Sequence, residues 1–241
     1  MAMTDTKIIR IPILPFNMVN AHLIQGPGGC VLVDAGLPGS QAKIGKMLNR
    51  RGLSFKDIKL IVVTHAHVDH AGSAYELRQL SRAPIVAHSD DARHFSRETP
   101  MTFCPTGWFG RQFLKAPLIH EPYTGFVPDI LLSKDETLDL SPYGIPGMIR
   151  HTPGHTAGSV SVVLESKDAL VGDLIASGIM LGGLIRTGHA IRPPFEDDPH
   201  TVGLELHRLL DSGMERFYMG HGGPLTADEV RRHAQFLQSI K

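Results

Sequence analysis

Several features that mark other classes of protein are scarce in this 241-residue sequence. It has only two cysteines, Cys30 and Cys104, so we expect no disulfide framework. Lysine and arginine together number 24, and aspartate and glutamate also number 24, so the chain has no net charge and no basic arm. This balance argues against nucleic acid or a membrane surface as the main partner.

Long hydrophobic runs are missing as well. The longest, residues 175–185, has 11 residues including three glycines, whereas a membrane-spanning helix needs about 20. Residues 1–6 lack the basic and then apolar segments of a secretory signal, so we expect a cytoplasmic protein. Hydrophobic residues still make up 42% of the chain, enough for a sizeable core, and no Pro- or Ser-rich linker divides it. We therefore expect a single domain over residues 1–241.

Patterns typical of strands and of helices occur in both halves of the chain. Apolar runs predict strands at 8–14, 21–24, 30–33, 58–63, 84–87, 130–132, 147–151, 159–164, 168–172 and 217–219. Helices are predicted after Ser40, at 74–81, after Asp198 and after Thr226, where Glu229 would complete a capping box. This arrangement predicts an α/β fold with sheets inside and helices outside.

Residues 94–128 interrupt this pattern. They hold five of the ten phenylalanines and the only tryptophan, Trp108, among prolines and glycines. A long aromatic loop inside a compact domain is usually a lid, a pocket wall or an interface. Ordinary helical packing on the core is the alternative interpretation.

Histidine is the residue in excess, with 14 copies against 10 of phenylalanine. Four chemically useful side chains follow the apolar run 58–63 within one short turn: His65, His67, Asp69 and His70. Imidazole and carboxylate are the ligands that Zn²⁺ and its first-row neighbours favour. His65 and His67 can reach one ion from the strand end, while Asp69 and His70, on the turn into a helix, face a second.

Four ligands do not complete two metal sites, so the motif predicts partners further along the chain. Three candidates each come directly after a predicted strand: His155 in a Pro-Gly turn, Asp173 after a glycine, and His221 between glycines. Strand ends that share one edge of the sheets would bring these side chains to the turn at 65–70. Most other histidines are assigned to the surface or to packing (His22, His88, His94, His120, His200, His207 and His233), and His151 to support of the turn at 152–156.

Together these motifs resemble the metallo-β-lactamase fold superfamily. The resemblance rests on Asp-Ala-Gly at 34–36, H-x-H-x-D-H at 65–70, T-P-G-H-T at 152–156, Gly-Asp at 172–173 and Gly-His-Gly at 220–222. It implies an αββα sandwich with two divalent ions at the sheet edge, most readily Zn²⁺, with Fe or Mn as alternatives. By matching positions, the first ion would be held by His65, His67 and His155, the second by Asp69, His70 and His221, with Asp173 bridging both.

This ligand set implies a dinuclear hydrolase in which a metal-bridging hydroxide attacks a polarised carbonyl. Asp69 is the nearest proton shuttle and therefore the expected catalytic residue besides its role as ligand. Asp34 and Thr64 are candidates to orient ligand imidazoles, although a simple turn cap at a strand end explains Asp34 equally well.

Departures from known subfamilies narrow the expected substrate. Asp173 stands where true metallo-β-lactamases carry Cys or Ser. Ala176 stands where some of these carry Lys, and where acyl-homoserine lactonases often have Tyr. We therefore expect a small carboxylic ester, thioester or lactone as substrate, with β-lactam hydrolysis as a promiscuous activity at most.

Substrate contacts are expected from Trp108, Phe109 and His189. A homodimer is also expected, since aromatic segments in relatives often pack between subunits. The alternative function is that of a persulfide-oxidising oxygenase, which uses one iron held by two histidines and the bridging aspartate.

Overall fold

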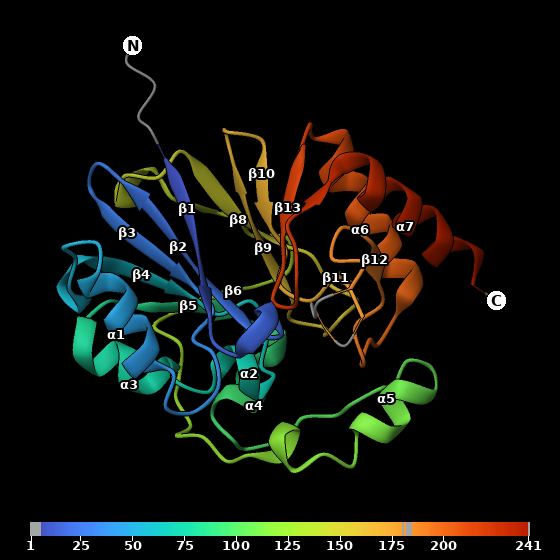
Figure 1. The fold of residues 1–241 in the computed structure, drawn as a ribbon. Coiled ribbons are helices and arrows are strands. Elements are labelled where there is room, and N and C mark those ends of the chain that lie inside the picture. Colours follow the sequence, from blue (N-terminus) through green and yellow to red (C-terminus); the bar gives the residue numbers. More distant parts are fainter. Residues whose placement is uncertain (1–5, 180, 182–184, 241) are drawn as a thin grey trace.

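The computed structural model describes residues 6–179, 181 and 185–240. Two six-stranded sheets pack face to face, with α1 and α3 against the first and α6 and α7 against the second (Figure 1). Apolar side chains from both sheets fill the space between them, Val31, Leu60 and Val162 among them. The result is the αββα sandwich that the motifs predicted.

The first sheet has the order β1-β2-β3-β4-β5-β6, antiparallel from β1 to β3 and parallel from β3 to β6. Its strands are β1 (Lys7–Pro12), β2 (Asn20–Gly26), β3 (Gly29–Val33), β4 (Ile58–Val62), β5 (Ile85–His88) and β6 (Ile130–Leu132). Strand β4 is buried on both faces except at the exposed Lys59, which interrupts its apolar run: Leu60 and Val62 face the other sheet, while Ile58 and Ile61 pack under the helices.

The second sheet has the order β14-β13-β10-β9-β8-β7 and is antiparallel except where β10 pairs with β13. Its strands are β7 (Leu138–Asp139), β8 (Gly147–His151), β9 (Val160–Leu164), β10 (Asp168–Leu170), β13 (Arg216–Tyr218) and β14 (Leu225–Thr226). A separate pair consists of β11 (Ala176–Ser177) and β12 (Ala190–Ile191).

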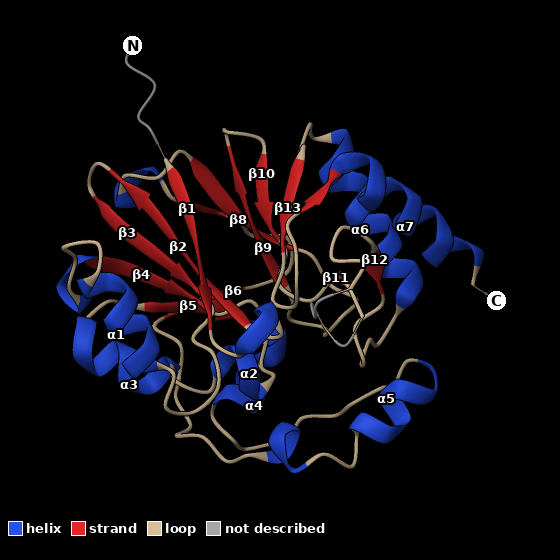
Figure 2. Cartoon of the chain, in the orientation of Figure 1, coloured by secondary structure: helices blue, strands red, loops and turns tan. Residues whose placement is uncertain are grey.

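Helices cover the outer faces of both sheets (Figure 2). The helices of the described residues are α1 (Gln41–Asn49), α2 (Val68–Ala71), α3 (Ala74–Ser81), α4 (Ala92–Phe95), α5 (Gly107–Phe113), α6 (Pro199–Asp211) and α7 (Ala227–Ser239), of which α5 lies away from both sheets. Single 3₁₀ turns lie at Pro15–Asn17, Phe55–Asp57, Ser89–Asp91, Pro117–His120 and Ser141–Tyr143. Among the described residues, no helix combines the length and the apolar character that crossing a membrane requires.

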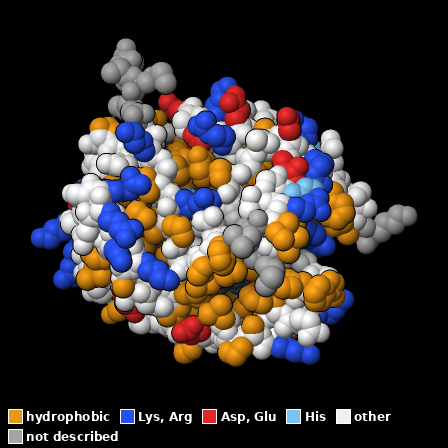
Figure 3. Space-filling model, in the orientation of Figure 1, with side chains coloured by type: hydrophobic (Ala, Val, Ile, Leu, Met, Phe, Trp, Pro, Cys, Tyr) orange, Lys and Arg blue, Asp and Glu red, His pale blue; other side chains and the backbone are white. Residues whose placement is uncertain are grey.

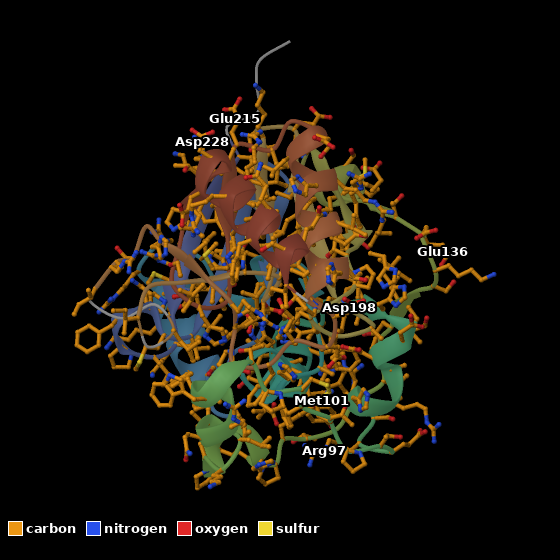
Figure 4. The ribbon with its side chains drawn as sticks, turned by 90° about the vertical axis from the view of Figure 1, so that its right-hand side faces the viewer. Arg97, Met101, Glu136, Asp198, Glu215 and Asp228 are labelled. Atoms are coloured by element: carbon orange, nitrogen blue, oxygen red, sulfur yellow. The ribbon has the colours of Figure 1, made fainter. Side chains whose placement is uncertain are left out.

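The helix positions agree with the sequence, but not every predicted cap forms. Asp198, labelled in Figure 4, accepts hydrogen bonds from the backbone N–H groups of His200 and Thr201 and so caps α6 as predicted. Neither Ser40 nor Thr226 makes a capping hydrogen bond. The predicted capping box is therefore wrong, because the Glu229 carboxylate instead accepts from the backbone N–H of Ala190 in β12.

Residues 94–128 form an arm of short helices and loops that includes α5 and lies below the sheets in Figure 1, and its two ends pack on the core through Phe95 and Phe126. Figure 4 shows Arg97 and Met101 of this arm at the opposite end of the molecule from Glu215 and Asp228. The arm joins the second half of the chain through Pro105, which bridges to Phe195, and through Thr106, whose N–H donates to Pro194 O at 2.7 Å. The expected lack of a secretory signal was based on residues 1–6. Of these, residues 1–5 lie outside the described residues.

Candidate metal centre

Loops from both sheets meet at one edge of the sandwich, beside α2 (Figure 1). The turn after β4 carries residues 65–70, the loop between β8 and β9 carries His155, and the ends of β10 and β13 lead to Asp173 and His221. All seven predicted metal-ligating side chains converge here, grouped so that their ligand atoms lie within 4.8 Å of one another. Parallel strands β4, β10 and β13 end on this edge, which is why residues so far apart in sequence come together.

The first group consists of three histidines whose ring nitrogens point at one another. His65 Nε2, His67 Nδ1 and His155 Nε2 are each 3.1 Å from the other two. A tetrahedral zinc with Zn–N bonds of about 2.0–2.1 Å requires nitrogens about 3.3–3.4 Å apart, so the triangle has nearly the size that one ion needs.

All three rings are buried and in the protonation state that a metal ligand requires. Burial, followed by neighbouring histidines, lowers the pKa of His67 to about 3. Burial lowers the pKa of His155 to about 4 and takes that of His65 well below its usual value. At neutral pH these imidazoles are therefore uncharged, with lone pairs available for a cation.

The second group combines carboxylates and imidazoles around Asp173. His221 Nε2 lies 2.9 Å from Asp173 Oδ2 and 3.3 Å from Asp69 Oδ2, and His70 Nε2 lies 3.4 Å from Asp173 Oδ1. His70 Nε2 and Asp173 Oδ1 are buried and make no hydrogen bond. Their separation of 3.4 Å is long for a hydrogen bond but close to the spacing of two ligand atoms on one cation, so these two atoms fit a site for a cation.

The charges around this second group also fit a site for a cation. Burial opposes the charged form of His221, but Asp173 and Asp69 outweigh it and raise its pKa to about 10. The pKa of His70 is also raised well above its usual value, because Asp173, Asp34 and Asp69 outweigh burial. In the protein without metal, protons on the two imidazoles compensate the carboxylates. A divalent ion would take over that positive charge.

Asp34 orients the second group from behind. His70 Nδ1 donates to Asp34 Oδ2 at 2.8 Å, which leaves His70 Nε2 to face the centre. Asp34 Oδ1 also accepts from the backbone N–H and the hydroxyl of Thr64, both at 2.9 Å. Asp34 thus both holds the end of β3 to the ligand turn and orients a ligand imidazole, so the two interpretations from the sequence are compatible. Thr64 Oγ1 lies 3.1 Å from His65 Nδ1 and completes the link to the first group.

Asp91 is a residue of the site that sequence reasoning missed. Its buried carboxylate accepts from Ala66 N–H, from the Thr156 hydroxyl and from Gly158 N–H, each at 3.0 Å. It therefore ties the turn that carries His65 and His67 to the loop that carries His155. The only signal in the sequence was an acidic residue shortly after a strand that ends on the same edge.

The loop around His221 is held by residues just before and at the start of β2, which sequence reasoning also missed. His221 Nδ1 donates to Met18 O, and the backbone N–H of Asn20 donates to Gly220 O at 2.8 Å. Gly220 approaches the ligands so closely that a Cβ there would lie 2.3 Å from His70 Cε1 and 2.5 Å from Asp173 Oδ1. Only glycine fits at this position.

Aromatic side chains cover the centre. The Phe103 ring stacks on His67 with centroids 5.0 Å apart, and Phe195 meets the same imidazole edge-on. A cavity of about 20 Å³ lies between these rings and Asp69, His155, Asp173 and His221. By volume it holds one or two water molecules.

A second, larger cavity of about 700 Å³ adjoins the first and shares Leu181 and Pro194 with its wall. Trp108 and Phe109 of α5 line this larger cavity. They do not line the small one at the ligand atoms, where Phe113 of the same helix stands instead. Residues 94–128 are therefore a pocket wall, one of the roles predicted for them.

His189 does not lie where the sequence predicted. Its Nδ1 is 3.0 Å from Glu229 Oε1 on α7, and it lines neither of the two cavities. The expected contact with substrate is corrected to a contact between the loop before β12 and α7. By contrast, His151 Nε2 donates to Ala157 O at 2.8 Å, so it supports the loop around His155 as predicted.

His88, Asp90 and His151 form another group of potential ligands. The rings of His88 and His151 stack face to face, with centroids 3.7 Å apart and an angle of 5° between their planes. Lone pairs on parallel rings run side by side and do not converge on one ion. These residues pack β5 against β8.

Comparison with known proteins agrees with this geometry. A model of the metallo-beta-lactamase superfamily matches residues 14–221. A probable metallo-hydrolase of Methanocaldococcus jannaschii is 29% identical over 204 residues, which cover 84% of this chain and 87% of that protein. The hydroxyacylglutathione hydrolase GloC of Haemophilus influenzae is 25% identical over 231 residues, which cover 95% and 97% of the two chains.

Solved structures show the same fold. A metallo-beta-lactamase family protein from Thermus thermophilus superposes with a TM-score of 0.68 at 25% identity, covering 97% of this chain and 78% of that one. The family match extends over most of the sequence and includes every residue of the candidate metal centre. The chain belongs to the metallo-beta-lactamase superfamily.

Proposed function

We propose that the protein is a dinuclear metal-dependent hydrolase that cleaves a small carboxylic ester, thioester or lactone. One observation carries the proposal: two groups of convergent ligand atoms lie side by side, with the carboxylate of Asp173 facing both His70 and His221 and coming within 4.0 Å of His155. Two divalent cations bound there, Zn²⁺ in the first instance, would lower the pKa of a water molecule and polarise a carbonyl oxygen.

The side chains around the centre have separate tasks in this proposal. The neutral imidazoles of the first group, and the carboxylates and imidazoles of the second, would hold the cations. Asp69 lines the small cavity and is partly exposed, so its carboxylate can take a proton from the attacking water and pass it to the leaving group. Phe103 and Phe195 keep other water molecules away from the reacting carbonyl.

The sizes of the two cavities indicate where the substrate lies. The small cavity has room for little more than the reacting atoms, so the rest of the substrate extends past Leu181 and Pro194 into the larger one. Its wall of Trp108, Phe109, Ile179 and Ile191 is apolar and suits an acyl or alkyl group. Acyl cleavage is also the reaction named for the H. influenzae relative, which supports this class of substrate.

Metal analysis combined with a substrate panel tests the proposal. Purified protein would be assayed with 4-nitrophenyl esters, acyl thioesters, lactones and a chromogenic β-lactam, with its metal content quantified in the same samples and an oxygen electrode alongside. We expect two divalent ions per chain and turnover of at least one ester, thioester or lactone that EDTA abolishes. One iron per chain with oxygen uptake in the presence of a glutathione persulfide would overturn the proposal in favour of an oxygenase.

A further inference from the structure

We propose that the substrate carries a carboxylate on the part that occupies the larger cavity, and that Arg192 recognises this carboxylate. The inference rests on the proposed function and names its substrate class: an ester, thioester or lactone whose acyl chain ends in an anionic group. Arg192 would then determine specificity, while the metal centre provides the chemistry.

The composition of the cavity wall is the first observation. Most of the side chains that line the larger cavity are apolar, and Arg192 is the one charged residue among the described residues of its wall. The hydroxyl of Thr106, another polar group there, is already used, since it donates to Pro193 O. Hydrophobic side chains gather on this part of the surface (Figure 3), and Trp108 is 72% exposed. An apolar ligand alone would exclude water from the guanidinium N–H groups that Glu196 does not accept from and would offer them no acceptor, which costs free energy.

The second observation is how Arg192 is held. Its Nε and Nη2 both approach the same oxygen, Glu196 Oε2, at 2.7 and 2.6 Å. This is not the fork in which two nitrogens meet two carboxylate oxygens. Within the described residues, Arg192 Nη1 has no hydrogen-bond acceptor, so two N–H donors of a positioned guanidinium remain for a ligand.

The third observation concerns the counter-ion. The Glu196 side chain is fully buried behind Arg192 and does not line the cavity. It therefore anchors the guanidinium from the protein side and leaves the cavity side open. Because a buried carboxylate holds this end of the side chain, Arg192 presents its free donors from one place. This is the arrangement that a receptor for a terminal carboxylate needs.

A matched pair of substrates tests the proposal in the metal-loaded enzyme. Mono-4-nitrophenyl adipate and 4-nitrophenyl hexanoate differ only in a terminal carboxylate or methyl group. We expect wild type to have the higher kcat/KM for the adipate ester. Arg192→Met should reduce that value at least tenfold through KM, while the value for the hexanoate ester stays within about twofold. Arg192→Lys should restore part of the preference, and Arg111→Gln, which removes an exposed charge from α5, should change neither value.

Binding without turnover separates this inference from the proposed function. Trp108, the only tryptophan, lines the cavity, so its fluorescence reports occupancy. Adipamic acid and hexanamide, which esterases do not readily hydrolyse, would be titrated into wild type and Arg192→Met. We expect adipamic acid to bind wild type at least tenfold more tightly than the variant. Equal binding to both proteins, or equal loss for both amides in the variant, would overturn the recognition role. Failure of every ester, thioester and lactone to turn over, with adipamic acid binding still dependent on Arg192, would instead contradict the hydrolase.

Discussion

The metal centre and the aromatic arm at 94–128 face each other across the same cavity but are built in opposite ways. Around the centre, buried carboxylates and backbone groups fix ligands and their loops from behind: Asp34 holds His70, Asp91 joins two ligand loops, and Met18 holds His221. The arm is held at its tip mainly by backbone contacts of Pro105 and Thr106, and Trp108 stands largely in solvent. Changes at the centre should therefore alter the chemistry, whereas changes in the arm should alter which substrate reaches it.

The largest effect is expected at Asp173, the carboxylate between the two groups. Asp173→Ala should lower kcat/KM for any substrate by at least about 10³-fold and reduce the metal content below two ions per chain, because both groups lose a shared ligand. Kinetics and metal analysis on the same protein would check this. Asp228→Asn, 97% exposed, is the control that should change neither. Full activity in Asp173→Ala would show that the assembled centre is not the site of reaction.

A smaller loss is expected when only the orientation of a ligand is disturbed. In Asp34→Asn, an amide nitrogen can take the place of the carboxylate oxygen that accepts the hydrogen bond from His70 Nδ1. An amide nitrogen cannot accept that bond, so the imidazole loses the partner that orients it. Loss of such a partner typically costs about 10–100-fold in metal affinity or activity. Metal titration with a competing chelator would measure the affinity. An unchanged affinity would mean that the position of His70 depends on packing alone.

Asp91, which links the two ligand loops, should contribute measurably to the free energy of unfolding. Asp91→Ala removes the acceptor of three buried hydrogen bonds, leaves the Ala66 and Gly158 N–H groups unpaired, and leaves the Thr156 hydroxyl with Ser159 Oγ alone. We expect a loss of about 2–3 kcal/mol in the free energy of unfolding, together with lower activity. Urea denaturation of the variant against Asp90→Asn, whose parent side chain is 51% exposed, would measure it. Equal stability of the two variants would contradict the role assigned to Asp91.

Changes in the arm should leave the chemistry intact. Trp108→Ala and Phe109→Ala remove apolar wall from the larger cavity, so KM for esters with long acyl chains should rise by about three- to tenfold. Metal content and kcat for a short acetate ester should remain the same. If instead kcat for acetate fell with metal content, the arm would be part of the centre, and the distinction between the two regions would fail.

The smallest effect is expected at Glu196 beside the larger cavity, where the ionisation of one carboxyl group should make the stability of the protein depend on pH. Burial raises the pKa of Glu196 to about 7, against the opposing effect of Arg192. The folded protein then binds a proton more tightly than the unfolded chain, so this group lowers stability as the pH rises from about 4.5 through 7. Glu196→Gln should remove the dependence, so that the variant gains stability relative to wild type as the pH rises from 5 to 8. Thermal denaturation of both proteins across that range would measure it, and parallel curves would refute the assignment.

The sequence predicted the metal centre better than the arm, because the residues of the centre lie in short local motifs. His65, His67, Asp69 and His70 lie on one turn, and the remaining ligands follow strand ends that the topology brings to one edge, so motif and strand pattern were sufficient. Asp91 was missed because its partners, Ala66 N–H and Gly158 N–H among them, become neighbours only when the two sheets pack.

Competing contacts explain the remaining errors. Glu229 could have completed a capping box at Thr226. In the folded chain its carboxylate instead contacts the Ala190 N–H of β12 and the imidazole of His189. The same contact removes His189 from the cavity. In the arm, aromatic composition indicated a pocket wall but not which rings reach the ligands, so Phe103 and Phe113 went unnamed as site residues. Such choices depend on tertiary contacts that local patterns do not encode.

The most direct test of the dinuclear centre is anomalous diffraction from crystals of the protein loaded with Zn²⁺, measured on both sides of the zinc absorption edge. We expect two zinc peaks per chain, one within bonding distance of His65, His67 and His155, the other of Asp69, His70 and His221, with Asp173 touching both. A single peak, or peaks bound elsewhere, would contradict the proposed centre.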